Sequence, residues 1–213
     1  MTHIWHKVGD QVPFVHPDDL PFVIAHNSQH EDRNDPLWIN TERMAEPRHG
    51  DIDAPIVLLQ LNPSYDERKL DIAQLRADLL DEHASHGGLR DADNPWWQKR
   101  AFGKLGRLYD RERLMRRVCS IEYFPYASLK FGHSHLRLPT QHYQFDLVRR
   151  ALSRQATLIV TRGFHLWAGA IPELASALGK TVFKTKNPQS PSISENNLDV
   201  VAYQRVIAAL GSD

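Results

Sequence analysis

The chain has 213 residues, a length typical of one domain with a sizeable core and short for two independent ones. It contains no apolar run near the ~20 residues of a membrane helix, and its first residues lack the basic start and apolar stretch of a secretory signal. The single cysteine, Cys119, excludes an intrachain disulfide and a cysteine-bound zinc or iron–sulfur cluster within one chain. We therefore expect one domain over residues 1–213, in the cytoplasm.

Charge is unevenly distributed although the net charge is zero. Residues 99–186 carry 17 Lys and Arg against 5 Asp and Glu, and the remainder carries 9 against 21. The densest basic stretch is 99–117. It is either a solvated helix paired with the acidic segments or a face that binds phosphates. The second interpretation makes DNA the expected partner.

The predicted elements begin after an N-terminal segment, residues 1–55, that is rich in Pro, Asp and His and includes the short apolar piece 21–25. We expect this segment to be irregular, with one or two edge strands. The nearly continuous apolar run 56–61 then predicts a strand that is buried on both faces. Helical patterns follow at 70–83 and 98–117.

Strands and helices alternate in the remaining sequence. Apolar patterns predict strands at 118–124, 157–161 and 181–186, and helices at 140–154, 166–178 and the C-terminus, with a break at Pro172. Four strands with helical connections predict an α/β fold: a three-layer αβα core over 56–210 around a central, mostly parallel four-stranded sheet. In such folds the ligand binds outside the carboxyl ends of the strands.

The loop after the first strand has the sequence Gln60-Leu61-Asn62-Pro63-Ser64-Tyr65. An Asn held at a strand end by the following proline offers one carbonyl and one NH2 in a defined direction, so Asn62 can orient a water or a ligand edge. The alternative is an ordinary turn, because Asn-Pro commonly begins one.

The loop after the last strand spans 187–194. Two prolines stiffen it, and its hydroxyls and backbone N–H groups suit phosphate contacts at a helix N-terminus. Ile193 is a candidate for a projecting apolar wedge. The alternative is a proline-rich turn that caps the last helix.

Together the two loops resemble the signature motifs of the uracil-DNA glycosylase superfamily. The first resembles the G-x-N-P-G form of the mismatch-specific uracil/thymine branch, with Asn62 and Pro63 matching and Gln60 and Ser64 in place of the glycines. The second resembles the H/N-P-S-x-L-S loop with one extra residue, on Asn187, Pro188, Ser190, Pro191 and Ile193. The resemblance covers residues 56–210.

The resemblance implies base excision, in which a nucleotide is flipped out of the duplex and water replaces its base at the sugar carbon. Asn62 would then orient the water, Asn187 would contact the departing base, and Tyr65 would wall the base pocket. Ile193 would fill the gap in the stack, and Ser190, Ser192 and Ser194 would hold phosphates. The expected binding site also includes Gln60, Pro63, Ser64, Glu122 and Pro188.

Two departures from the family pattern bear on the substrate. Ser64 in place of a glycine restricts close approach of the backbone to a ligand. Glu122 occupies the position at which the family commonly places an Asn that contacts uracil. An ionised Glu122 accepts from the uracil N3–H but repels O4, so a base with an exocyclic amine would suit it better. The alternative for Glu122 is a salt bridge to a nearby arginine.

Histidines do not show a metal-binding pattern in the sequence. The closest pair, His133 and His135, has no nearby cysteine and no H-E-x-x-H spacing, and we expect it in an exposed loop. We therefore expect no metal, no other cofactor and no membrane partner, and a monomer.

Two functions remain open at this point. The first is an N-glycosylase that excises a flipped-out modified base from DNA. The second is a catalytically inactive member of the same fold that binds nucleic acid or another protein. An unrelated hydrolase or transferase has less support, because the sequence lacks G-x-S-x-G, Walker and G-x-G-x-x-G motifs.

Overall fold

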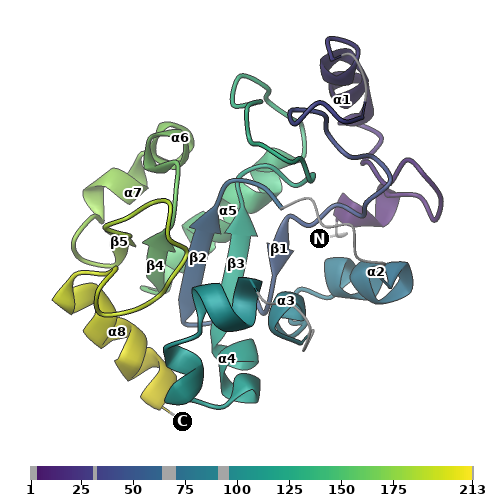
Figure 1. The fold of residues 1–213 in the computed structure, drawn as a ribbon. Coiled ribbons are helices and arrows are strands. Elements are labelled where there is room, and N and C mark those ends of the chain that lie inside the picture. The colour runs from purple at the N-terminus through teal and green to yellow at the C-terminus, as the bar shows by residue number, and fades with distance from the viewer. Residues whose placement is uncertain (1–3, 31–32, 64–70, 91–95, 213) are drawn as a thin grey trace.

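A computed structural model describes residues 4–30, 33–63, 71–90 and 96–212. A five-stranded sheet lies at the centre, in the order β1-β3-β2-β4-β5 (Figure 1). Its strands are β1 (Arg48–His49), β2 (Ile56–Gln60), β3 (Val118–Glu122), β4 (Thr157–Val160) and β5 (Val182–Lys184). All neighbours pair in parallel except β1, which is antiparallel to β3. The mostly parallel α/β sheet is confirmed, but it has five strands rather than four because residues 48–49 add an edge.

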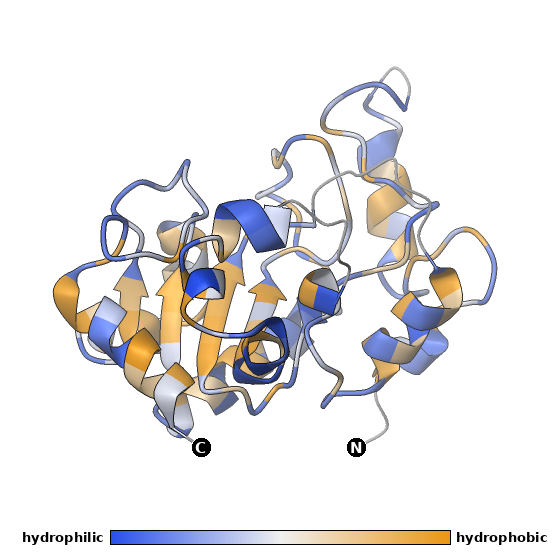
Figure 2. Ribbon diagram, turned by 60° about the horizontal axis from the view of Figure 1, so that its bottom comes forward, coloured by the Kyte–Doolittle hydropathy of each residue, from blue (hydrophilic) through white to orange (hydrophobic). Residues whose placement is uncertain are grey.

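Helices cover both faces of the sheet, because side chains alternate between two apolar cores along each strand. On β2, Val57 and Leu59 enter one core while Ile56 and Leu58 enter the other. The apolar strands lie between the two helical layers in Figure 2. One core receives α5 (Gln141–Ser153), α6 (Phe164–Ala170) and α7 (Glu173–Ser176); the other receives η2 (Trp96–Ala101), η3 (Leu105–Arg107), α4 (Arg111–Arg117) and α8 (Val200–Gly211). Of the helices that the structure describes, none combines the length and the apolar character needed to span a membrane.

The helical pattern at 98–117 does not form one continuous helix, because the chain forms the π-helical turn η2, the 3-10 turn η3 and then α4. At Gly103 a Cβ would come within 2.3 Å of the Lys99 carbonyl oxygen, so the backbone is too close there for any other residue. Asp110 then starts a new helix by accepting a hydrogen bond from the Arg113 N–H at 2.7 Å.

The N-terminal segment is less irregular than predicted. It contains η1 (Ile4–Lys7) and α1 (Leu20–Asn27), so the apolar piece 21–25 is helical. Two further helices, α2 (Ile72–Leu80) and α3 (Gly87–Arg90), follow β2. The buried Asp19 carboxylate accepts hydrogen bonds at 2.6 Å from the hydroxyls of Tyr126 and Thr140. A third apolar core, which includes Trp5, Phe124 and Tyr126, joins this segment to the chain that follows β3.

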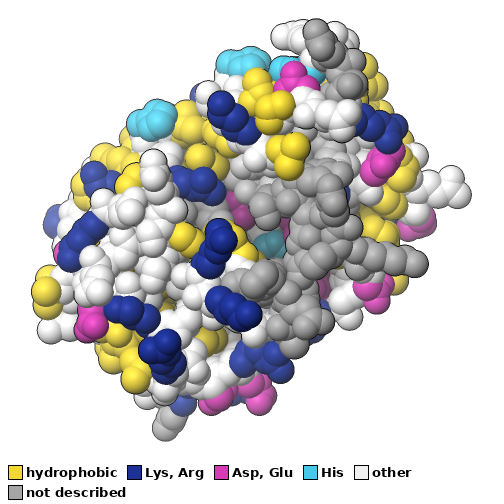
Figure 3. Space-filling model, in the orientation of Figure 1, with side chains coloured by type: hydrophobic (Ala, Val, Ile, Leu, Met, Phe, Trp, Pro, Cys, Tyr) yellow, Lys and Arg dark blue, Asp and Glu magenta, His cyan; other side chains and the backbone are white. Residues whose placement is uncertain are grey.

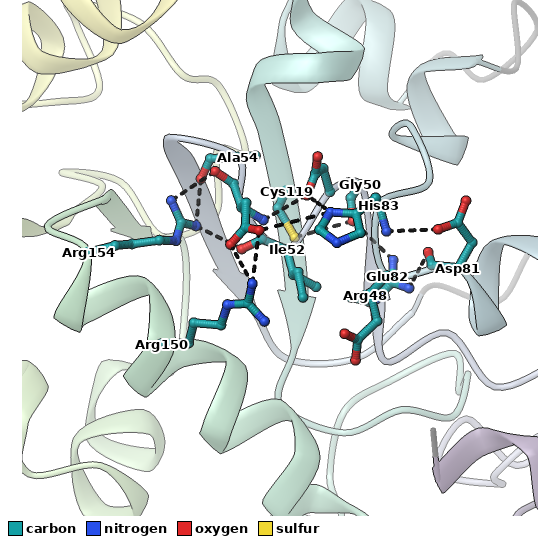
Figure 4. A network of polar contacts seen from close by, with 12 residues as sticks. Arg48, Gly50, Ile52, Ala54, Asp81, Glu82, His83, Cys119, Arg150 and Arg154 are labelled. Carbon is teal, nitrogen blue, oxygen red and sulfur yellow. Dashed lines mark hydrogen bonds and ion pairs between the residues drawn. The ribbon is translucent and has the colours of Figure 1, made fainter. Parts of the chain in front are cut away.

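A network of arginines organises the amino end of the parallel strands, opposite their carboxyl ends (Figure 4). Arg48 donates to the Gly50 carbonyl at 3.0 Å, and Arg154 donates to the Ile52 and Ala54 carbonyls at 2.9 and 2.7 Å. These bonds hold the turn that enters β2. Burial raises the pKa of Cys119 to about 12, so this thiol is an inert core group.

Candidate functional site

A hollow lies over the carboxyl ends of β2 and β3 (Figure 3). An acidic and a histidine side chain are visible in its depth, and Lys and Arg side chains border it. The carboxyl edge is where ligands bind in parallel α/β sheets, so the residues at these strand ends are the first candidates for function.

Gln60 and Glu122 end the two strands side by side. They are paired in register, so their side chains lie on the same face of the sheet. Only 5% of Gln60 and 3% of Glu122 is exposed, yet within the described part of the chain neither Gln60 Nε2 nor Glu122 Oε2 has a hydrogen-bond partner. An unsatisfied buried polar group costs about 1–3 kcal/mol. Two such groups on adjacent strand ends indicate a binding site for a polar ligand.

A second buried carboxylate, Glu46, sits close enough to Glu122 to affect its charge. Burial alone would raise the pKa of Glu46, but the ion pair with Arg43 at 2.6 Å and the hydrogen bond with His49 at 3.0 Å lower it to about 2. Burial raises the pKa of Glu122 well above its ordinary value, and the Glu46 charge raises it further, while Arg162 opposes the shift. Glu46 is therefore ionised, and the site favours the neutral form of Glu122.

The neutral form of Glu122 changes the chemistry expected from the sequence. An ionised carboxylate only accepts hydrogen bonds, whereas a neutral carboxyl group has one O–H donor and one carbonyl acceptor. Burial and the charge of Glu46 thus shift Glu122 away from the ionised form expected from the sequence and toward the neutral form. The alternative for Glu122, a salt bridge, is not found: within the described ranges Glu122 makes no ion pair.

The raised pKa of Glu122 predicts a pH-dependent stability. The folded state binds this proton more tightly than the unfolded state, so stability falls as pH rises above the ordinary value of 4.5, by up to about 1.4 kcal/mol per pH unit until the raised pKa is reached. Glu122→Gln should therefore be more stable than the wild type at neutral pH and equal to it in acid, as measured by urea unfolding.

Glu46→Gln provides the matched control for this measurement, with the opposite sign. In the wild type, the low folded-state pKa of Glu46 means that the ionised carboxylate stabilises the fold above pH 4.5. This stabilisation is lost as pH falls toward about 2. We expect Glu46→Gln to be less stable than the wild type at neutral pH. Equal, pH-independent effects of both variants would contradict the assigned protonation states.

Asn62 is held by its neighbours at the same edge. Its Nδ2 donates to Ser128 Oγ at 2.9 Å and to the Pro63 carbonyl at 3.0 Å, and among the described residues no donor contacts its Oδ1. The fixed amide thus presents an acceptor that can orient a water, as the sequence predicts. The predicted roles of Ser64 and Tyr65 lie outside the described residues.

The second loop satisfies most of its own polar groups. Asn187 and Pro188 are exposed, and Asn187 Oδ1 accepts from the Gln189 N–H at 2.9 Å. Ser192 Oγ donates to Ser194 Oγ at 3.1 Å, and Ser190 Oγ accepts from the Ser192 N–H at 3.4 Å. These contacts are those of a structured turn. Asn187 also follows β5, which is separated from β2 by β4.

The prediction that Ile193 projects as a wedge is wrong. Its side chain is fully buried in the core shared with α8, and its N–H donates to the Ala101 carbonyl at 2.9 Å. Ser194 is 2% exposed, so it also has little access to phosphates. The physical reason is that the loop turns inward here to close the core beneath η2.

The basic stretch divides into two parts. Arg113 and Arg117 donate to carbonyl oxygens of Ser212 and Ala209, at 2.8 and 2.7 Å, and so stabilise the C-terminal end of α8. Arg107 and Arg111 are exposed instead, and they line a cavity of about 200 Å³. Of these two pairs, the second is placed for contact with a phosphate, and Lys99 and Arg100 of the same stretch are also exposed.

Three residues of the site were missed by the sequence analysis. Glu46 lies in the N-terminal segment, Ser128 follows β3, and Arg162 follows β4. The signal for Arg162 was its place directly after a predicted strand. Its position follows from Gly163, whose φ of +67° turns the chain sharply into α6. Glu46 and Ser128 carry no local signal, because only the folded chain brings them to the sheet edge.

Comparisons with known proteins do not add a relative: no protein-family model, curated protein or solved structure matches the chain.

Proposed function

We propose that the chain binds a nucleobase in the hollow over β2 and β3 and hydrolyses its N-glycosidic bond in DNA. The observation that carries this proposal is the pair of buried, unpaired groups at the strand ends, Gln60 Nε2 and Glu122 Oε2. A polar ligand would satisfy both groups if it placed an acceptor near Gln60 Nε2 and a hydrogen-bonding group near Glu122 Oε2. A flipped-out base has this chemistry.

The hydrogen-bond pattern of the site favours an oxo base over an amino base. Gln60 offers a donor, and neutral Glu122 offers an acceptor and a second donor. This set is complementary to a base edge with a ring N–H between two carbonyl oxygens, as in uracil. A neutral Glu122 therefore prefers a carbonyl group on the base, whereas an ionised Glu122 would prefer an exocyclic amine.

The same groups support a reaction sequence. Asn62 Oδ1 accepts a hydrogen bond from a water, and the water oxygen bonds to the sugar carbon as the carbon–nitrogen bond breaks. The bond electrons move to the base, and donors from Gln60 and Glu122 stabilise the negative charge on its oxygen. The base leaves with the proton released from the water.

A panel of duplex and single-stranded oligonucleotides, each with one altered base, tests this proposal by formation of abasic sites. We expect release of an oxo base such as uracil or hypoxanthine, and weaker release of bases that carry an amine at the same edge. The proposal fails if the protein releases no base from any oligonucleotide.

The second loop favours a second candidate function, a non-catalytic module that binds nucleic acid. In this loop Asn187 and Ser192 already bond within the turn, and Ile193 is buried. Binding of an oligonucleotide with an unpaired or altered base, without any abasic product, would favour this candidate over base excision.

Arg107 and Arg111 give a prediction for DNA binding. Affinity should fall steeply with salt, because each neutralised phosphate releases counterions. The variant Arg107→Glu/Arg111→Glu should bind more weakly, with a slope of log affinity against log salt that is smaller by about 2. Fluorescence anisotropy measures both quantities.

The control for this experiment reverses two exposed charges at a distance from the basic cavity, in Arg149→Glu/Lys180→Glu. It changes the net charge by the same amount and should leave the salt slope near that of the wild type. Equal effects of the two double variants would assign DNA binding to net charge alone. No binding by the wild type at ~50 mM salt would remove this face as a DNA contact.

A further inference from the structure

Four histidines from two distant segments come together beside α1. His26 lies in the last turn of α1 and His30 is four residues further along the chain, whereas His133 and His135 lie in the loop after β3 (Figure 1). The His26 ring centroid is 4.6 Å from that of His30, 5.7 Å from that of His133 and 5.9 Å from that of His135. Imidazoles around one tetrahedral zinc ion would have centroids about 5 Å apart, given Zn–N bonds of about 2.1 Å.

One ring nitrogen of His26 and one of His30 make the contact that is typical of a metal-bound histidine. His26 Nε2 contacts the Leu37 carbonyl at 3.0 Å, and its buried Nδ1 has no hydrogen-bond partner among the described residues. His30 Nδ1 contacts the Asp35 carboxylate at 2.8 Å, which directs its Nε2 away from that carboxylate. A metal-bound histidine typically donates its other ring N–H to a carbonyl or carboxylate in this way.

His133 is the least expected member of the group. The exposed loop predicted for it is wrong: its side chain is fully buried against Phe124 and Phe131, and no described residue forms a hydrogen bond with either ring nitrogen. A buried imidazole with two unsatisfied nitrogens is costly. A ligand that accepts its lone pair would relieve this cost. His135 is exposed and closes the group from the solvent side.

We propose that His26, His30, His133 and His135 bind one divalent transition-metal ion, with Zn²⁺ the best match to an all-imidazole site. As the rings stand, no three of their nitrogens lie within 4.8 Å of one another. Metal binding therefore requires the rings to turn inward, which the exposed His135 and the turn that carries His30 allow. The ion would join α1 to the loop after β3.

A second group of ligand-type residues, Asp51, Asp53 and His83, does lie within 4.8 Å. Arg150 already contacts both oxygens of Asp53, each at 2.9 Å, so this group is neutralised (Figure 4). It also lies at the amino end of the sheet. It serves as the comparison site in the experiment.

The test uses the full chain after treatment with a chelator, titrated with Zn²⁺ in competition with a chromophoric chelator. We expect one equivalent to bind, with an increase in melting temperature. His135→Ala and His30→Ala should each weaken binding at least about tenfold, and Asp35→Asn about 10- to 100-fold, because it orients His30. His83→Ala and His165→Ala should bind as the wild type does.

Circular dichroism and melting of the metal-free proteins separate loss of the site from loss of the fold. His135 is exposed, so His135→Ala decides the test if His30→Ala is destabilised. Absence of Zn²⁺ binding by the wild type would overturn the proposal. So would binding that is lost in His83→Ala and unchanged in His135→Ala.

Discussion

Asn62→Ala should lower base release by on the order of 10- to 1,000-fold while the protein stays folded. The expected loss is large because a group that orients the attacking water acts in the transition state, where one such contact is worth on the order of 10- to 1,000-fold. The structure supports the role of the side chain, whose amide nitrogen is bonded to Ser128 and whose oxygen has no described donor. Single-turnover formation of abasic sites measures the effect.

Two further variants make this experiment decisive. Ser128→Ala removes a bond that positions Asn62, so it should reduce release by less than Asn62→Ala does. Asn196→Ala changes an exposed asparagine that lies just after the second loop, and it should have no effect. Release by Asn62→Ala within a factor of about three of the wild type would exclude the water-orienting role, because it lies below the range expected for such a contact. A lower melting temperature with no change in release would assign Asn62 to the turn alone.

Glu122→Met should reduce release of an oxo base by roughly 5- to 150-fold, because it leaves polar atoms of the base unpaired in a buried site at a cost of about 1–3 kcal/mol. Glu122→Gln should retain most of the activity, since its amide also supplies one donor and one acceptor edge. The two substitutions are similar in size, so their difference isolates hydrogen bonding from packing.

The pH dependence of the same two proteins identifies the protonated form. In the wild type, release of an oxo base should fall as pH rises through the raised pKa of Glu122, because the carboxylate loses its donor. Glu122→Gln cannot ionise and should lack this decline. A wild-type preference for a base with an exocyclic amine, unchanged by pH, would instead return Glu122 to the ionised state expected from the sequence.

The sheet and the carboxyl ends of its strands could be predicted from the sequence, because a strand that is buried on both faces has a continuous apolar run of residues. Strands such as 56–60 are almost continuously apolar, and each is bounded by residues that end it. Because such runs alternate with helical patterns, the strands were predicted to pair in parallel. Asn62 was identified in the same way, from its place directly after a predicted strand, whereas Glu122 was identified from the resemblance to the uracil-DNA glycosylase pattern.

The charge state of the site was decided only by the tertiary structure. Glu122 would be ionised in an exposed strand end. The fold buries it beside Glu46, a residue of the N-terminal segment that is itself held ionised by Arg43, and this raises the pKa of Glu122 and favours its neutral form. Electrostatic shifts sum over neighbours in space, and a local sequence pattern does not contain them.

The sequence by itself therefore determined the positions of four strands along the chain and their parallel pairing, because these depend on patterns within a few residues. Only the tertiary structure decided that Ile193 turns inward, that residues 48–49 join the sheet, and that four histidines meet beside α1. His26 and His133 have no local pattern in common. Their contact exists because the third core closes the N-terminal segment over the loop after β3, and long-range packing of this kind is not encoded in either segment alone.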